Sequence, residues 1–532
     1  MSSNKNQVFM KGALILMIAN LTVKLIGAGF KIPLTYVLGK EGMGLFSSSY
    51  QMYAWMFVIA TAGFPVAISR MVAESRARGN ITESKKIFSC SLILMGVIGI
   101  IGAAILYFGA GIFTDFMMNR DAELGIKAIA PALFFVGVMS AFRGYFQGRQ
   151  DMIPTAVSEV VEALGKLVFG FLLAVMLMPL GLAYGSAGAV FGVTVGAFGG
   201  MVIIVIMYSV KNRKDRKGGP ADFGQPRSVG GIVSELAKIA IPITIGASVF
   251  SLTSVIDMVM IMRRLQDGAG FSYEQALGLW GSYSGYANPV FNMPPSIITP
   301  IGISIVPAVA AAMAGSDIRF ARRITATAVK VTTLFALPAS IGVSVLSGPI
   351  LMFLFQDKFA EQSLTLLALV IVFVSLVMVT NATLQAVGKE YVPVINMLIG
   401  GAIKIIVNYI LVGIPEININ GAPIGSMLCY IVILTLNIYS IKKSVGVKFG
   451  IMPTVVKPLL SSVAMGIVAI VTYNYTEFLG NRVAVVIAIA VAGVVYLGMI
   501  FLLGAVTKED MQMLPKSEKL IPVMERFKLI RR

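Results

Sequence analysis

Histidine is missing from this chain of 532 residues, and cysteine occurs only twice, at Cys90 and Cys429. The absence of histidine removes the imidazole that most often serves as general base, metal ligand or proton relay. Both cysteines lie within apolar runs, so we expect neither a disulfide framework nor a metal site. Charged residues are also scarce, at 13% of the chain against 57% hydrophobic residues. This balance excludes a soluble globular protein.

Long apolar runs recur along the chain from Phe9 to Val506. A run of about 18 residues or more can cross the hydrocarbon core of a bilayer as a helix. Strands or loops exposed to lipid would leave their backbone groups unpaired, so the runs predict an all-α polytopic membrane protein with about 14 transmembrane helices. The expected spans are residues 9–38, 43–64, 86–112, 123–146, 153–178, 184–210, 239–262, 279–313, 324–347, 362–386, 391–412, 421–441, 454–475 and 482–506.

The excess of basic residues follows the connections between these spans. The chain has 43 Lys and Arg against 25 Asp and Glu, a net charge of +18. Because cytoplasmic loops retain positive charge, the richer set of connections places both termini in the cytoplasm of a multi-pass plasma-membrane protein. Topology then explains the charge, and no nucleic-acid partner is expected. The basic tail is expected to bind anionic lipids of the inner leaflet.

The chain also contains an internal repeat. Gly44-Leu-Phe recurs as Gly278-Leu-Trp, and Gln147-Gly-Arg recurs at nearly the same offset as Val387-Gly-Lys. We expect two six-helix lobes related by a pseudo-two-fold axis along the membrane normal, as in alternating-access transporters, with the substrate between them. The expected parts are an N-lobe at 1–210, a basic cytoplasmic linker at 211–231, a C-lobe at 232–442, two extra C-terminal helices within 443–506, and a basic cytoplasmic tail at 507–532.

Three stretches carry a resemblance to a known superfamily: Met10-Lys-Gly-Ala-Leu-Ile-Leu, Ala62-Gly-Phe-Pro-Val-Ala-Ile-Ser-Arg and Arg143-Gly-Tyr-Phe-Gln-Gly-Arg. They resemble the polysaccharide-transporter branch of the MATE/flippase (MOP) superfamily, in the group of stage V sporulation protein B and the MurJ-type lipid II flippases of Gram-positive bacteria. The resemblance implies a fourteen-helix, two-lobed flippase. Its implied substrate is a polyprenyl-diphosphate-linked saccharide, such as a lipid II-like cell-wall precursor, moved from the inner to the outer leaflet.

Ionisable groups within the spans are the candidate site residues, since charge inside a membrane is costly. Lys24 and Lys31 lie on one face of the first span, and Arg70 lies at the cytoplasmic end of the second. Cations along one path would bind the diphosphate of the substrate. The alternatives are structural pairing for Lys24, snorkelling to the outer surface for Lys31, and simple topology for Arg70.

Acidic residues in the spans suggest ion pairs or coupling sites. Glu159, Glu162 and Lys166 share one helical face, and Glu162 and Lys166 have the favourable i, i+4 order for a pair. Glu159 would then either pair with Lys24 or bind a coupling proton. In the second lobe, Asp257 is expected to pair with Lys404 or else to bind a cation.

The leading hypothesis is therefore an alternating-access flippase for a lipid-linked saccharide diphosphate, acting as a monomer and not as an enzyme. A MATE-like ion-coupled antiporter of small molecules is the alternative, and it would favour an acidic cavity in the N-lobe. An integral-membrane glycosyltransferase would need a large acidic extramembrane loop, which the chain lacks. No metal or cofactor is expected, although membrane potential or a monovalent cation could drive transport.

Overall fold

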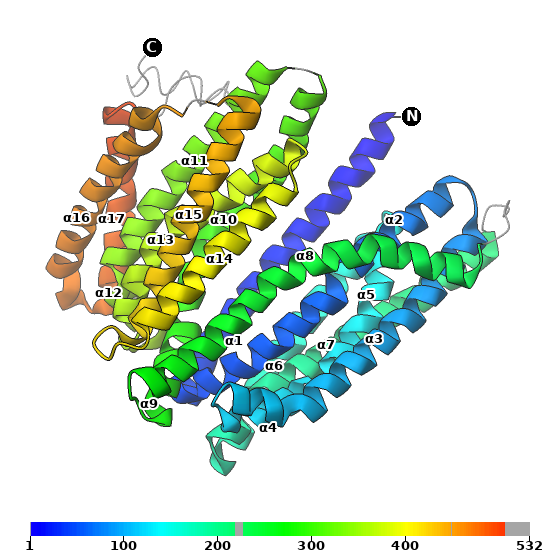
Figure 1. Ribbon diagram of the computed structural model, residues 1–532, viewed down its shortest axis with the longest axis horizontal. Coiled ribbons are helices and arrows are strands. Elements are labelled where there is room, and N and C mark those ends of the chain that lie inside the picture. The colour runs from blue at the N-terminus through cyan, green and yellow to red at the C-terminus, as the bar shows by residue number, and fades with distance from the viewer. Residues whose placement is uncertain (1, 219–226, 316, 448, 506–532) are drawn as a thin grey trace. The chain divides into compact units, whose positions relative to one another are not determined.

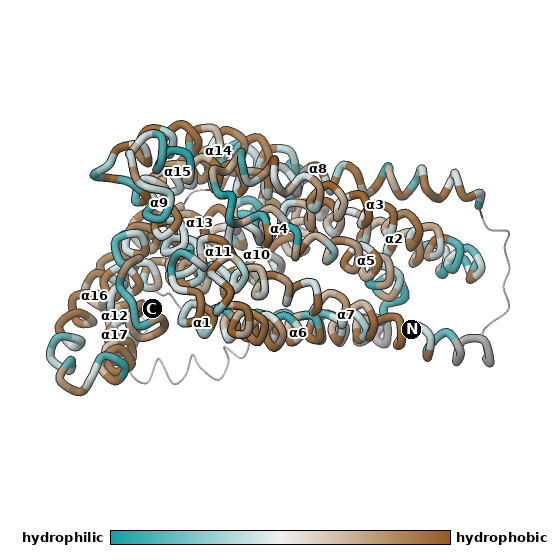
Figure 2. The backbone as a smooth tube through the Cα atoms, turned by 90° about the horizontal axis from the view of Figure 1, so that it is seen from below, coloured by the Kyte–Doolittle hydropathy of each residue, from teal (hydrophilic) through white to brown (hydrophobic). Residues whose placement is uncertain are grey.

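The structure is a computed structural model that describes residues 2–218, 227–315, 317–447 and 449–505. Regular structure in these ranges is helical, with no strand, which confirms the predicted all-α class. The expected tail at 507–532 lies outside the described residues, as does the middle of the expected linker. Figure 2 shows hydrophobic residues along most of the helices and hydrophilic residues at many of the connections.

Twelve helical stretches of the described residues are long and apolar enough to cross a membrane. The first of them, Ile18–Ala77, is interrupted at Gly39, whose backbone adopts φ 64° and ψ −173°. Glycine accepts this positive φ because it has no side chain. Helix α8, of 35 residues, is also of spanning length although it is not among the twelve. The predicted polytopic fold is thus confirmed, and the number fourteen stays a prediction.

The chain divides into two compact units, the first formed by residues 1–266 and 271–281. Its helices run from the blue to the green part of the ribbon in Figure 1. They are α1 (Ser2–Thr61), α2 (Phe64–Ala77), α3 (Ile81–Phe116), α4 (Glu123–Ile129), α5 (Ala132–Gly148), α6 (Ile153–Leu177), α7 (Leu182–Gly218), α8 (Val229–Arg263) and α9 (Tyr273–Gly281).

Helix α8 packs against α1, α2 and α3, so it belongs to the first compact unit. The expected division at 211–231, which assigns this segment to the C-lobe, stays a prediction. Gly63 allows the close approach, because the carbonyl of Ala240 on α8 lies against its Cα. At the start of α8, Arg227 pairs with both Glu83 and Glu235. Burial would lower the pKa of Arg227, but these two carboxylates raise it above its ordinary value. The repeat and its axis stay predictions.

The second unit, residues 267–270 and 282–532, contains the remaining helices. They are α10 (Asn288–Ala314), α11 (Ile318–Val345), α12 (Ser347–Phe355), α13 (Glu361–Ala386), α14 (Tyr391–Leu411), α15 (Gly421–Val445), α16 (Lys457–Thr476) and α17 (Asn481–Leu502). A buried apolar cluster joins α10, α11, α13 and α15, and a separate one joins α16 and α17. The last two helices of the described chain therefore pair with each other.

A buried polar network connects three helices of the second unit. Asn437 on α15 donates from Nδ2 to Thr380 Oγ1 at 3.0 Å and to Asn381 Oδ1 at 2.7 Å, both on α13. Asn396 on α14 donates from its own Nδ2 to Asn437 Oδ1 at 2.8 Å. Asn437 is fully buried. The network thus fixes the mutual register of α13, α14 and α15 through side-chain hydrogen bonds.

Candidate functional site in the first unit

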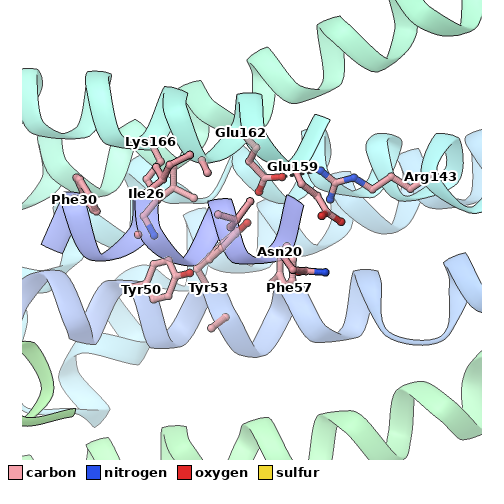
Figure 3. Close-up of a pocket in the computed structure, with 15 residues that line it drawn as sticks. Asn20, Ile26, Phe30, Tyr50, Tyr53, Phe57, Arg143, Glu159, Glu162 and Lys166 are labelled. Carbon is pink, nitrogen blue, oxygen red and sulfur yellow. Dashed lines mark hydrogen bonds and ion pairs between the residues drawn. The ribbon is translucent and has the colours of Figure 1, made fainter. Parts of the chain in front are cut away.

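A cavity of about 310 Å³ lies among helices α1, α5, α6 and α7 of the first unit. Figure 3 shows side chains from these helices converging on it. Most of its wall is apolar. The polar lining residues are Asn20, Tyr50, Tyr53, Arg143, Glu159, Glu162 and Lys166. Ionisable residues are rare within membrane-spanning segments, so a cavity lined by four of them is a candidate functional site.

Glycines position helix α6, which supplies three of the charged groups. Gly165 lies so close to α7 that an added Cβ would be 2.7 Å from the Cα of Gly196. A Cβ on Gly188 of α7 would likewise be 2.7 Å from the carbonyl oxygen of Leu173. Small residues at such interfaces let membrane helices approach backbone to backbone. Helix α6 is therefore fixed against α7, while its charged side chains line the cavity together with residues of α1 and α5.

Arg143 on α5 forms the ion pair at one end of the cavity. Its Nη2 donates to Glu162 Oε2 at 2.9 Å, and its Nε donates to Ser158 Oγ at 3.0 Å. The side chains are only 13% and 22% exposed, for Arg143 and Glu162 respectively. Removing either partner of a pair this buried would destabilise the protein, because the remaining charge would be uncompensated. The pair joins α5 to α6.

Lys166 lies at the other end of the cavity, over aromatic rings. Its Nζ is 4.4 Å from the centroid of Tyr50 and 5.4 Å from that of Phe30. Both rings belong to α1 and present their electron-rich faces to the ammonium group, a cation–π arrangement. Tyr50 continues into a row of aromatic residues, with Tyr53 at 5.9 Å and then Phe57 at 5.7 Å from Tyr53, measured between centroids.

These contacts correct two expected ion pairs. Glu162 pairs with Arg143 and not with Lys166, because the guanidinium of α5 reaches the carboxylate that the i, i+4 rule had assigned to Lys166. Lys24 is exposed and does not line the cavity. No ion pair between Lys24 and Glu159 occurs among the described residues. Glu159 Oε2 is instead buried without a hydrogen-bond partner in that part of the chain.

Comparison with known proteins shows the family to which the chain belongs. Residues 9–313, more than half of the chain, match the family described as Polysaccharide biosynthesis protein. The chain belongs to this family. Residues 282–410 also match the MatE family, and the chain is a member of the MOP superfamily, which confirms the resemblance seen in the sequence.

Two relatives of this chain come from Bacillus subtilis (strain 168). The lipid II flippase MurJ is 27% identical over 531 residues, which cover 94% of this chain and 96% of the relative. The stage V sporulation protein B is 25% identical over 532 residues, with coverages of 97% and 99%. The matches extend over almost the full length of all three chains.

Solved structures show the same fold at lower identity. A lipid II flippase MurJ in an inward closed conformation superposes with a TM-score of 0.69 at 14% identity, covering 91% of this chain and 98% of that one. A multidrug resistance MATE transporter in an inward-facing conformation gives a TM-score of 0.64 at 16% identity, with coverages of 79% and 95%. The fold is thus that of MOP transporters.

The other predicted site residues do not line the cavity. Lys31 is half-buried on α1. Arg70 on α2 is 65% exposed and donates from Nε to Glu74 Oε1 at 2.9 Å. Asp257 is buried on α8 in the first unit, whereas Lys404 is half-buried on α14 in the second. Their roles in substrate or ion binding, and the pairing of Asp257 with Lys404, stay predictions.

Arg143 is the cavity residue that sequence reasoning undervalued. The expected span 123–146 ends close after Arg143, so the sequence does not single it out as a site residue. The structure continues α5 to Gly148, which places Arg143 more than one turn inside the helix. The signal that could have found it is its position in an otherwise apolar helix.

Among the described residues no cluster of three carboxylate or cysteine ligands suitable for a metal ion occurs.

Proposed function

We propose that this MOP-superfamily transporter is a flippase for a polyprenyl-diphosphate-linked saccharide, such as a lipid II-like cell-wall precursor. In this proposal the headgroup crosses from the inner to the outer leaflet by alternating access, while the lipid tail stays in the bilayer. The protein acts as a monomer in the plasma membrane, with both termini in the cytoplasm. Its chemistry is transport and not bond making or breaking, in line with relatives whose names describe flippases.

The observation that carries the proposal is the pair of cations inside the cavity of the first unit. Arg143 and Lys166 both line a space enclosed by spanning helices. A guanidinium offers planar donors that match two phosphate oxygens at once, and an ammonium adds a compact charge. The aromatic row that begins at Tyr50 offers flat apolar faces on which a sugar ring can stack. These features suit an anionic, glycosylated headgroup.

A second candidate is a MATE-like antiporter that exchanges a small cation or drug for an ion. Glu159 and Glu162 line the same cavity, and one oxygen of Glu159 has no partner among the described atoms. A carboxylate of this kind can bind a cationic substrate or a proton. The two candidates differ in the sign of the transported charge, since a flippase substrate is anionic and a typical antiporter substrate is cationic.

Reconstitution in liposomes tests the two candidates against each other. The full-length protein is reconstituted with a fluorescent undecaprenyl-diphosphate disaccharide, and exposure of the headgroup is followed by a membrane-impermeant quencher. We expect movement between leaflets that is faster than in protein-free liposomes, and that decreases in Arg143→Gln but not in the matched control Arg149→Gln, at the C-cap of the same helix. If the lipid does not move while an organic cation is exchanged for protons, the antiporter is correct and the flippase proposal is wrong.

Depletion in cells supplies the substrate identity. If the proposal is correct, loss of the protein should make a lipid-linked saccharide accumulate on the cytoplasmic side, and mass spectrometry of the lipid extract identifies its glycan.

The proposal also includes a driving force: membrane potential or a monovalent cation drives export, and no bound cofactor is needed. Anionic lipids of the inner leaflet are the proposed partners of the basic tail.

A further inference from the structure

Two carboxylates in the cavity lie beside a single arginine, which forms an ion pair with one of them. Glu162 accepts the hydrogen bond from Arg143 Nη2, and Ser158 Oγ accepts the one from Arg143 Nε. Glu159 precedes Glu162 by about one turn on the same face of α6, and its Oε2 is buried without a hydrogen-bond partner among the described atoms. Figure 3 shows both carboxylates beside the guanidinium of Arg143. One carboxylate oxygen thus lacks the donor that burial normally demands.

The other groups around Glu159 do not supply this donor. Lys166 holds its ammonium over the rings of Tyr50 and Phe30, at the opposite end of the cavity. Tyr53 of α1 lines the cavity, and its buried hydroxyl also has no hydrogen-bond partner in the described chain. Helix α7 contributes only the apolar Val193. The titratable groups that line the cavity are therefore Arg143 from α5, Glu159, Glu162 and Lys166 from α6, and the tyrosines of α1, with Lys31 of α1 close enough to Lys166 to interact with it electrostatically.

Charge balance limits what can enter this space. Arg143, Lys166, Glu159 and Glu162 sum to zero when all four are ionised. A phosphate anion would add negative charge beside two carboxylates, in surroundings where like charges repel strongly. If the anion draws Arg143 away from Glu162, two neighbouring carboxylates lose their common counter-ion. Binding of one proton to that pair removes the repulsion and supplies an O–H donor between the two oxygens.

We propose that Arg143 exchanges Glu162 for a phosphate group of the transported lipid, and that the Glu159–Glu162 pair takes up one proton in the same step. The inference rests on the proposed flippase function and deepens it, because it makes this cavity a linked site for an anion and a proton. No covalent bond of the lipid forms or breaks, and the proton comes from water. The complex then holds more protons than the free protein, so anion binding strengthens as pH falls, by up to about tenfold per pH unit.

Calorimetry measures this linkage directly. Farnesyl diphosphate is titrated into the full-length protein in detergent micelles, in two buffers that differ in ionisation enthalpy. We expect an uptake of about one proton per bound diphosphate in the wild-type protein. The double variant Glu159→Gln/Glu162→Gln should bind without uptake, because glutamine accepts the hydrogen bond from Arg143 but takes up no proton. Protonation of farnesyl diphosphate itself is common to both proteins and cancels in the comparison.

A matched control and a conservative variant complete the test. Arg149→Gln changes the arginine at the C-cap of α5, which does not line the cavity, and it should behave as wild type. Arg143→Lys should bind farnesyl diphosphate more weakly, since lysine lacks the two-pronged geometry. If the double variant does not fold, Glu159→Gln alone must lower the proton uptake.

The outcomes separate this inference from the proposed function. Wild-type binding without proton uptake, or equal uptake in the double variant, overturns the inference and leaves the flippase proposal intact. Uptake that depends on the two glutamates supports it. A wild-type protein that binds no prenyl diphosphate at all overturns the inference and also contradicts the substrate class proposed above.

Discussion

Replacing Gly165 by alanine tests whether the contact between α6 and α7 positions the cavity. The added Cβ would lie 2.7 Å from the Cα of Gly196. Two carbon atoms in ordinary contact are about 3.5–4.0 Å apart, so the two helices must separate locally by roughly 1 Å. Overpacking of this kind typically costs about 1–3 kcal/mol. The neighbouring residue Lys166 would move with the helix, away from its place over Tyr50.

The matched control is Gly199→Ala on α7. Its added Cβ would meet only Val161 Cγ1, at an ordinary 3.7 Å. Both variants gain helix propensity of about 0.5–1 kcal/mol, so this gain cancels between them. We therefore expect Gly165→Ala to be less stable than Gly199→Ala by about 1–3 kcal/mol, or roughly 5- to 150-fold in the unfolding equilibrium.

The assay is unfolding of both purified variants in mixed micelles of increasing sodium dodecyl sulfate content, followed by far-ultraviolet circular dichroism. Transport by the folded fraction is measured in parallel, and we expect it to fall only for Gly165→Ala. Equal stability and equal transport of the two variants would refute the claim that backbone contact with α7 sets the position of the charged face of α6.

Three further predictions concern the charges and the topology. Arg143→Met and Glu162→Leu should each destabilise the protein by about 3–5 kcal/mol, since each leaves a buried charge unpaired, and the double variant should recover most of the loss in the same unfolding assay; additive losses would contradict the pairing. Lys24→Ala should leave the amount of folded protein unchanged, because Lys24 is exposed. It should abolish transport if Lys24 binds the diphosphate, whereas Lys24→Arg keeps part of it, and a fully active Lys24→Ala protein would exclude that role. In a background without the native cysteines, a cysteine at Lys214 should react with impermeant reagent only from the cytoplasm and one at Asp121 only from outside; labelling of Asp121 from the cytoplasm would refute the orientation.

The sequence was sufficient to predict the class of fold and the helix that supplies three of the four charged residues of the site. Apolar runs of membrane-spanning length admit few alternatives to helices in lipid. The spacing of Glu159, Glu162 and Lys166 placed all three on one face, and all three do line the cavity. These features depend only on helical geometry, which the local sequence determines.

The partners of those charges could not be predicted from the same spacing. The i, i+4 rule describes an isolated helix and does not include a guanidinium presented by another one. Arg143 takes Glu162 because α5 lies beside α6, and Lys166 is free to face Tyr50 for the same reason. The packing of α8 on the first unit was equally hidden, since a repeat records the likeness of two segments and not which neighbours they contact.

The network of Asn381, Asn396 and Asn437 has a consequence for how the second unit is made. Synthesis proceeds from the N-terminus, so α13 and α14 enter the membrane before α15 has left the ribosome. During that interval the amides of Asn381 and Asn396 lack the partner that Asn437 later supplies. Polar amides in lipid are costly without a partner. The two earlier helices therefore depend on water, the insertion machinery or transient partners until α15 arrives, and the assembly of these three helices is a step after insertion that the third asparagine completes.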